Sequence, residues 1–182
     1  MNVTIEPRHE EWLHRPWRPE INGWSQDIAP FYAAVAELLP LRGRMLEIGV
    51  CEGRSILFLA SLLYEIGKPH ARLTGLDPTI SEVLLKNKAS VAPRCDVELI
   101  KGWSAESSLA FQGHEFDAVF IDGGHEYDNV CEDILAYQDK VKPGGVLGGH
   151  DYGNPEWPGV RRAVDRLLPK AQLFHSVWWV TR

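Results

Sequence analysis

The sequence predicts an α/β fold, a largely parallel sheet with helices on both faces. Short apolar runs of strand length alternate with longer segments of helical period, and such alternation is typical of βαβ units. In addition, Asp and His residues follow two of the apolar runs, at residues 122–125 and 150–151. Residues of this kind are expected at the carboxyl ends of parallel strands, where α/β sheets bind their ligands.

The expected elements follow one another along the chain. A first helix begins at Ile28, because apolar residues recur at helical spacing from there to Pro40. The strands are expected at residues 45–48, 72–76, 97–100, 116–121 and 146–147. Helices are expected near residues 54–66, 80–91, 104–110, 127–138 and 160–168. Residues 172–175 and 177–181 lie close enough together to form a terminal antiparallel hairpin.

The first 27 residues differ from the regular body of the chain. They hold three prolines and three tryptophans without a sustained helical or strand period, so we expect an irregular arm over residues 1–27. The remaining length, residues 28–182, suits one domain with a sizeable core. Trp12, Trp17 and Trp24 would either pack as a static hydrophobic cover or close over a substrate as a lid.

Composition narrows the classes of partner. The 19 basic and 25 acidic residues give a net charge of −6 without a basic cluster, which argues against nucleic acid and favours a small molecule. Three widely spaced cysteines and an N-terminus without a signal-like segment indicate a cytoplasmic location. The longest apolar run, residues 56–64, is too short to cross a bilayer core of about 30 Å. We therefore expect no membrane partner.

The turn after the first expected strand is rich in glycine and follows a carboxylate. Gly49 and Gly53 permit a tight turn and close approach of a ligand, although their spacing departs from the dinucleotide-binding fingerprint. Glu47 lies inside an apolar strand, where a carboxylate is costly unless something pairs with it. The partner would be a ligand or, in a purely structural role, Arg44 or Arg72.

Acidic residues recur near the expected strand ends. Asp77 ends the second strand, where a carboxylate can accept hydrogen bonds from both hydroxyls of a ribose. The acidic residues that we place along one rim are Glu47, Glu52, Asp77, Glu106 and Asp122. Such a rim would repel a pyrophosphate but suits a ligand with a sulfonium and an ammonium group. Charge therefore favours S-adenosylmethionine over NAD.

These residues carry a family resemblance. The motifs are Glu47-Ile-Gly49-x-x-x-Gly53-x-Ser55, Asp77, the segment 102–106 (Gly-Trp-Ser-Ala-Glu), the segment 120–125 (Phe-Ile-Asp-Gly-Gly-His) and the segment 142–152. Over residues 28–182 they resemble class I S-adenosylmethionine-dependent methyltransferases. The last motif is most similar to the small-molecule O-methyltransferase branch that includes macrolide-sugar and cephalosporin-tailoring enzymes. The resemblance implies an enzyme with a Rossmann-like, doubly wound, mostly parallel seven-stranded sheet and a C-terminal antiparallel hairpin.

The resemblance also implies a cofactor site. Glu47 and Gly49 would lie near the methionine end of the cofactor, Ser55 would bond its carboxylate, and Asp77 would hold the ribose. Ser104 and Ala105 would flank the adenine. The full set of residues implied to bind the cofactor is Glu47, Gly49, Gly53, Ser55, Asp77, Ser104, Ala105 and Asp122.

A catalytic base and a metal follow from the same comparison. In catechol-type relatives the segment that matches 122–125 begins with a metal-ligating Asp and ends with a base, so His125 would be the general base here. Asp122, His150 and Asp151 would hold Mg²⁺ or another divalent cation. An imidazole suits Mn²⁺, Fe²⁺ or Zn²⁺ better than Mg²⁺, so two arrangements stay open. In the first, all three residues ligate the cation. In the second, only the two carboxylates ligate it, and His150 orients them or acts as a second base.

The expected activity is O-methylation of a small-molecule hydroxyl, on a sugar or a secondary metabolite. Part of the substrate cover would come from a homodimer. One alternative is a protein that binds the cofactor without catalysis. A second is a metal-dependent hydrolase that uses Asp122, His125, His150 and Asp151 directly. Structural roles are open too: the two aspartates would then cap helices, and His125 would bond backbone at a helix start.

Overall fold

The computed structural model describes residues 2–14, 18, 21, 26–91 and 95–182, arranged around one seven-stranded sheet. The strands are β1 (Arg44–Ile48), β2 (Arg72–Asp77), β3 (Asp96–Lys101), β4 (Phe116–Ile121), β5 (Val141–Gly149), β6 (Gln172–Phe174) and β7 (Val177–Thr181). The α-helices are α1 (Pro7–Glu10), α2 (Ile28–Leu38), α3 (Arg54–Glu65), α4 (Glu82–Val91), α5 (Ser104–Ser108), α6 (Tyr127–Tyr137) and α7 (Pro158–Leu167). Two short 3₁₀ helices are η1 (Glu11–His14) and η2 (Gln138–Lys140).

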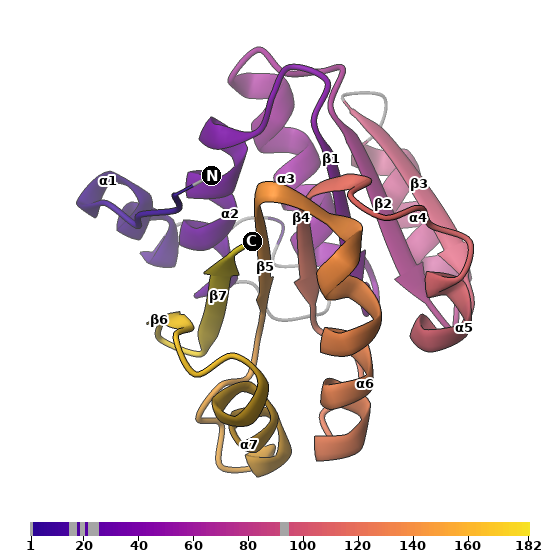
Figure 1. Ribbon diagram of the computed structural model, residues 1–182. Coiled ribbons are helices and arrows are strands. Elements are labelled where there is room, and N and C mark those ends of the chain that lie inside the picture. Colours follow the sequence, from indigo (N-terminus) through magenta and orange to yellow (C-terminus); the bar gives the residue numbers. More distant parts are fainter. Residues whose placement is uncertain (1, 15–17, 19–20, 22–25, 92–94) are drawn as a thin grey trace.

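The strand order confirms the predicted fold class. It runs β3-β2-β1-β4-β5-β7-β6 across the sheet (Figure 1). The first five strands in this order are parallel, whereas β7 is antiparallel to both β5 and β6. The chain first builds outward from β1 to β3 and then returns to place β4 on the other side of β1. The carboxyl ends of β1 and β4 therefore form the switch point at which open α/β sheets bind ligands.

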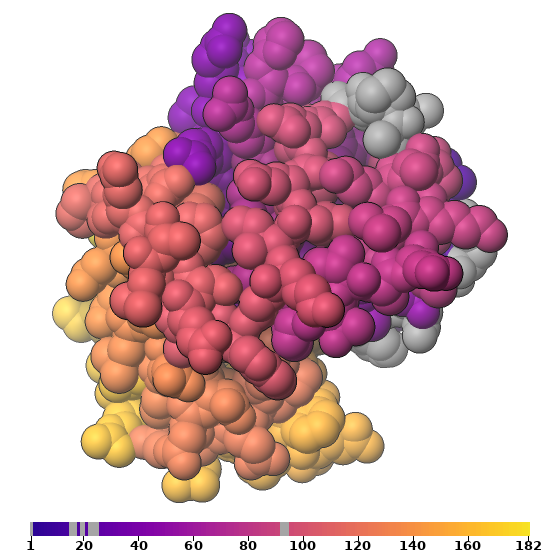
Figure 2. Space-filling model, turned by 90° about the vertical axis from the view of Figure 1, so that its right-hand side faces the viewer, coloured from indigo at the N-terminus to yellow at the C-terminus, as the bar shows by residue number. Residues whose placement is uncertain are grey.

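Helices cover both faces of the sheet (Figure 1) and enclose two cores. Tyr32 of α2 and Leu59 of α3 belong to one core, and Ile134 of α6 and Val164 of α7 belong to the other. Strand β4 is buried throughout, and its consecutive residues Val119 and Phe120 face opposite cores, as the alternation of a strand requires. Figure 2 views the molecule from its β3 edge, where α5 lies beside α6.

Two local predictions were wrong. The arm is not irregular throughout, because residues 7–10 form α1 and η1 follows directly. The backbone amide of Glu6 donates to His9 Nδ1 at 3.0 Å, as part of a capping box at the start of α1. The helix is too short to show a helical period of apolar residues, so the sequence pattern did not indicate it. In addition, β5 begins at Val141 rather than at residue 146, although Pro143 and two glycines follow within four residues.

The described part of the arm packs as a cover. The Trp12 ring lies edge-on against Phe58 of α3, with 5.1 Å between centroids, and Val3 and Ile21 are buried in the same core. For Trp12, the structure therefore favours the static cover over the lid. Trp17 and Trp24 lie outside the described residues. Among the helices that the structure describes, none combines the length and the apolar character that crossing a membrane would need.

Glu47 in β1 ties two helices to the central strand. Its side chain is 1% exposed. The Tyr32 hydroxyl donates to Oε2 at 2.6 Å and the Ser55 hydroxyl donates to Oε1, so the predicted structural pairing with Arg44 or Arg72 is wrong. Those two arginines pair with Glu115 and Asp96 instead.

Burial raises the pKa of Glu47 from 4.5 to about 8, against the lowering effect of its two hydroxyl partners. A raised carboxyl pKa means that the folded state holds a proton that the unfolded state releases, so stability falls as the pH rises between these two values. Glu47→Gln removes this dependence. As the pH rises through that window, we expect the unfolding free energy of Glu47→Gln to increase relative to that of wild type by up to about 1.4 kcal/mol per pH unit. Denaturant unfolding at several pH values measures it.

Glu82→Gln, at an exposed residue of α4, is the matched control and should follow wild type at every pH. A constant difference between Glu47→Gln and wild type across the window would contradict the assigned protonation of Glu47.

Candidate active site

A cavity of about 1010 Å³ opens at the carboxyl ends of the parallel strands. Its walls come from the segments after β1, β2, β3, β4 and β5, together with Asp27 before α2 and Ser176 before β7. Its carboxylates are Asp27, Asp77, Asp122, Asp133, Asp151 and Glu156. Of the predicted acidic rim, only Asp77 and Asp122 line this cavity.

The turn after β1 depends on Gly49. Its φ is +82°, and a Cβ at this position would overlap the carbonyl oxygen of Asp122, so only glycine fits. The Gly49 amide donates to the Leu76 carbonyl at 2.8 Å, and the Asp122 amide donates to the Ile48 carbonyl at 2.8 Å. These contacts bring the turn after β1 directly against the loop after β4.

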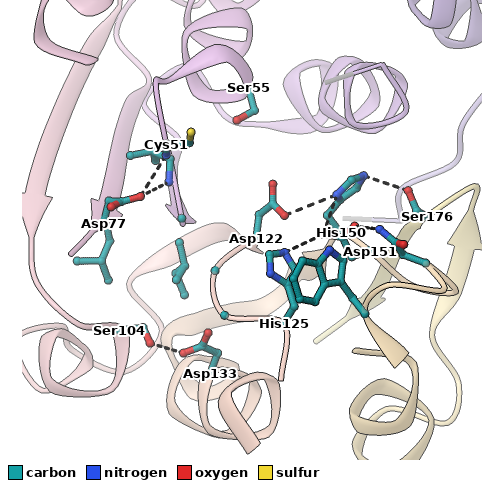
Figure 3. Close-up of a pocket in the computed structure, with 18 of the residues that line it drawn as sticks. Cys51, Ser55, Asp77, Ser104, Asp122, His125, Asp133, His150, Asp151 and Ser176 are labelled. Atoms are coloured by element: carbon teal, nitrogen blue, oxygen red, sulfur yellow. Dashed lines mark hydrogen bonds and ion pairs between the residues drawn. The ribbon is translucent and has the colours of Figure 1, made fainter. Parts of the chain in front are cut away.

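Asp77 holds the same turn from the other side. Its Oδ2 accepts hydrogen bonds from the amides of Val50 and Cys51, both at 3.1 Å, and its Oδ1 accepts one from the Thr79 amide at 2.8 Å. Figure 3 shows Asp77 and Cys51 on one side of the cavity, with Asp122 and the histidines toward the other. The carboxylate predicted to hold a ribose thus lines the cavity and also shapes the glycine turn.

The other predicted cofactor residues fall into two groups. Gly49, Ser55, Ser104 and Asp122 line the cavity together with Asp77. Glu47, Gly53 and Ala105 are not among its lining residues. Glu47 acts on the cavity indirectly, since it accepts the hydrogen bond that orients the Ser55 hydroxyl. Gly53 has φ +89° and is the N-cap of α3.

His125 is paired with Asp151. The His125 Nε2 lies 2.9 Å from Asp151 Oδ2, and the imidazole stacks on the Trp157 ring at 4.5 Å between centroids and 21° between planes. The hydrogen bond to Asp151 is the largest cause that raises the pKa of His125, partly offset by burial. Nδ1 of His125 has no hydrogen-bond partner among the described residues, so this nitrogen is available to a substrate.

His150 lies among three carboxylates. Its Nε2 lies 3.1 Å from Asp27 Oδ1, and its Nδ1 lies 3.3 Å from Asp151 Oδ2 and 3.6 Å from Asp122 Oδ1. Burial lowers the pKa of His150, but the hydrogen bonds to these carboxylates outweigh burial and raise it well above its usual range. Burial likewise raises the pKa of Asp151, but hydrogen bonds from His125, His150 and Asn154 hold it well below its usual range.

Asp27 and Ser176 complete this network, and sequence reasoning missed both. The Ser176 hydroxyl donates to Asp27 Oδ2 and lies 3.0 Å from His150 Nε2 (Figure 3). Asp27 precedes a helix, which is a common position for a cap, and Ser176 lies in a two-residue turn. Neither residue belongs to a motif that would have identified it.

Three side chains are placed to share a cation. One ligand atom each from Asp122, His125 and Asp151 lies within 4.8 Å of the others. The two carboxylates are those predicted from the sequence, whereas His150 stands outside this group and is ion-paired to both of them. The donor set of two oxygens and one nitrogen fits a divalent metal of the first transition row.

The predicted structural roles of these residues are wrong. The residue before α6 is Glu126 and the residue before α7 is Trp157, so neither Asp122 nor Asp151 caps a helix. Among the described residues, the partner of the His125 ring is the Asp151 carboxylate rather than backbone. Helix capping therefore does not explain why both aspartates and His125 line the cavity.

Comparisons with known proteins agree with this geometry. Residues 46–152 match a family model described as a methyltransferase domain. The chain is 32% identical over 136 residues to the uncharacterized protein R132 of Acanthamoeba polyphaga mimivirus. That match covers 69% of this chain and 59% of the viral protein, so the chain spans less than two thirds of its relative.

Solved structures share the fold at low identity. CalS11, a TDP-rhamnose 3'-O-methyltransferase of calicheamicin biosynthesis, has a TM-score of 0.62 at 18% identity, covering 96% of this chain and 91% of CalS11. MycE of the mycinamycin pathway, in complex with Mg and SAH, has a TM-score of 0.65 at 21% identity, and the match covers 97% of this chain and 55% of MycE. A putative rRNA methylase from Clostridium thermocellum has a TM-score of 0.67 at 14% identity, and the match covers 85% of this chain and 96% of the methylase.

The family match spans more than half of the chain and includes the glycine turn, Asp77 and the segment with His125 and Asp151. The seven-stranded sheet places these segments along one edge, around a single cavity. The chain therefore belongs to this methyltransferase-domain family.

Proposed function

We propose that this chain is an S-adenosylmethionine-dependent methyltransferase that transfers the methyl group of its cofactor to a hydroxyl oxygen of a small molecule. The observation that carries the proposal is the His125–Asp151 pair, 2.9 Å apart in the wall of the cofactor cavity. A neutral hydroxyl is a weak nucleophile, and a positioned imidazole is the group that removes its proton as the bond to carbon forms. A carboxylate on the far nitrogen orients the ring for that task.

The cofactor would span the cavity from Asp77 to Asp122. Asp77 would accept hydrogen bonds from the ribose hydroxyls, and the Gly49 turn would let the methionine portion approach the backbone closely. The Ser55 hydroxyl donates to Glu47 here, so it would exchange this hydrogen bond for one to the methionine carboxylate. The cavity carries six carboxylates, which suits the sulfonium and ammonium charges of the cofactor.

The reaction is an in-line displacement at the methyl carbon. The acceptor oxygen forms a bond to that carbon, the S–CH₃ bond breaks with its electron pair staying on sulfur, and the hydroxyl proton moves to His125 Nδ1. Asp151 accepts from Nε2 and stabilises the imidazolium that results. The stack on Trp157 keeps the ring plane fixed during the transfer.

Asp122 and Asp151 would hold a divalent cation if one is used; His125 lies within reach of the same ion, but both of its nitrogens are engaged when it acts as the base. Such an ion lowers the pKa of a bound hydroxyl and orients a vicinal diol. Asp122 and Asp151 belong to both sets of ligands that the sequence and the structure indicate, so they are the residues we assign to this role. His150 supplies positive charge beside them.

A sugar or a secondary-metabolite scaffold is the acceptor class that we favour. CalS11 is a TDP-rhamnose methyltransferase, and MycE was solved with the macrolide mycinamycin VI. In this chain the segment from Tyr152 to Trp157 lines the cavity next to His125, so it would form the acceptor side. The cavity volume of about 1010 Å³ is at the upper end of the range for small-molecule sites, which suits a cofactor together with an acceptor.

Asp77→Ala tests the cofactor placement. We expect wild-type protein to bind S-adenosylhomocysteine and the variant to lose at least about tenfold in affinity, since a charged hydrogen-bond partner is worth roughly 1.5–3 kcal/mol. Isothermal titration calorimetry measures both. Asp96→Ala, at an exposed carboxylate of β3, should bind as wild type does. Equal affinity of Asp77→Ala and wild type would remove Asp77 from the cofactor site.

His125→Ala tests the base. We expect turnover to fall about 10²–10⁴-fold, while the affinity for S-adenosylhomocysteine stays close to wild type, because His125 lies on the acceptor side. Release of S-adenosylhomocysteine with a panel of hydroxylated acceptors measures the first quantity and calorimetry the second. The exposed His70 provides the control His70→Ala. A variant that loses cofactor affinity but keeps turnover at saturating cofactor would contradict this role.

Asp151→Asn tests the cation site. We expect Mn²⁺ to bind the wild-type protein and the variant to lose about tenfold or more in affinity, because the exchange removes a charged ligand. Electron paramagnetic resonance of free Mn²⁺ measures the bound fraction. Asp139→Asn, at an exposed carboxylate of η2, is the control. Mn²⁺ that binds both variants and wild type equally would place any cation elsewhere.

A further inference from the structure

A buried carboxylate in the cavity wall has no part in the mechanism above. Asp133 of α6 is 3% exposed and lines the cavity. The Ser104 hydroxyl donates to its Oδ1 (Figure 3). Among the described residues, Oδ2 has no hydrogen-bond partner and the carboxylate has no ion pair. Oδ2 points toward Gly123, where a Cβ would lie 3.5 Å from it.

The environment of Asp133 leaves it in need of a donor. Burial raises the pKa of Asp133 from 3.8 to about 6, more than the Ser104 hydrogen bond lowers it, and nearby Glu132 raises it further. Asp133 lines the cavity, so a ligand that closes over Oδ2 without donating to it would leave a carboxylate oxygen buried and unsatisfied, which costs free energy. A ligand that brings an N–H group to Oδ2 would avoid this cost, whereas a ligand that brings a carbonyl oxygen would incur it.

The neighbouring residues fit a flat heterocycle. Trp103, directly before Ser104, lines the same cavity but is 67% exposed, so it does not serve as core. The Tyr137 hydroxyl donates to the Ser104 carbonyl at 2.7 Å, which fixes the start of α5 against α6. An exposed aromatic side chain next to a rigid buried acceptor is a suitable surface for a purine with an exocyclic amine.

We propose that Asp133 selects the adenine base of the cofactor, with Oδ2 accepting a hydrogen bond from the exocyclic amine. Ser104 then has a positioning role: its hydroxyl occupies Oδ1 and turns the other oxygen toward the ligand. Because a carboxylate can only accept, the site rejects a base with an oxygen in place of the amine. This inference rests on the proposed placement of the cofactor with adenine next to Ser104.

The test compares S-adenosylhomocysteine with S-inosylhomocysteine, which replaces the amine by a carbonyl. Calorimetric titrations are made above the pKa of Asp133, on wild type, Asp133→Asn and Asp128→Asn. Asp128 is an exposed carboxylate of the same helix. We expect wild type and Asp128→Asn to prefer the adenosyl compound by roughly tenfold to a hundredfold. Asp133→Asn should lose or reverse this preference, because its amide can donate to the carbonyl.

Ser104→Ala keeps the carboxylate but removes the hydroxyl that positions it, so we expect a preference for adenine that is weaker than in wild type but not lost. This variant provides a second measurement if Asp133→Asn does not fold. An Asp133→Asn protein that binds both compounds more weakly by the same factor would overturn the inference, as would a Ser104→Ala protein without preference. In either case binding by wild type would leave the cofactor assignment intact. Failure of wild type to bind either compound would overturn the cofactor placement itself.

Discussion

The contact between the backbones of Gly49 and Asp122 is the constraint on which the site depends. No side chain fits at Gly49, because a Cβ would overlap the Asp122 carbonyl, and the adjacent hydrogen bond from the Asp122 amide to Ile48 holds the two loops together. In the proposed function, one loop would approach the cofactor, and the other begins the segment that ends at His125. Two backbones in contact would therefore set the separation between methyl donor and base, and an in-line transfer tolerates little error in that separation.

Electrostatic balance is the second requirement of this site. Asp27, Asp122 and Asp151 all lie within 3.6 Å of a nitrogen of His150, and like charges so close repel one another unless a positive charge lies between them. A protonated His150 supplies this positive charge. In the proposed function the two histidines therefore have separate roles: His150 balances the carboxylates, and His125 would move the proton.

Features that leave a local pattern in the sequence could be predicted. The strand at residues 116–121, the carboxylate at Asp77 and the pairing of the loops with His125 and Asp151 follow from apolar runs that end in polar residues. Sequence reasoning failed where partners are distant and chemically ordinary. Asp27 meets a histidine 123 positions away, and Glu47 is satisfied by hydroxyls rather than by the nearby arginines. Asp133 lies in an unremarkable helical repeat, so only the fold reveals that it faces the cavity.

The most direct test of this account is the destination of a labelled methyl group. S-adenosylmethionine with a deuterated methyl group is incubated with the protein and a panel of sugars and hydroxylated metabolites, and the product is analysed by tandem mass spectrometry and nuclear magnetic resonance. The account predicts a deuteromethyl ether, with the label on oxygen. Label found on carbon or nitrogen, or transferred only to nucleic acid or protein, would contradict it.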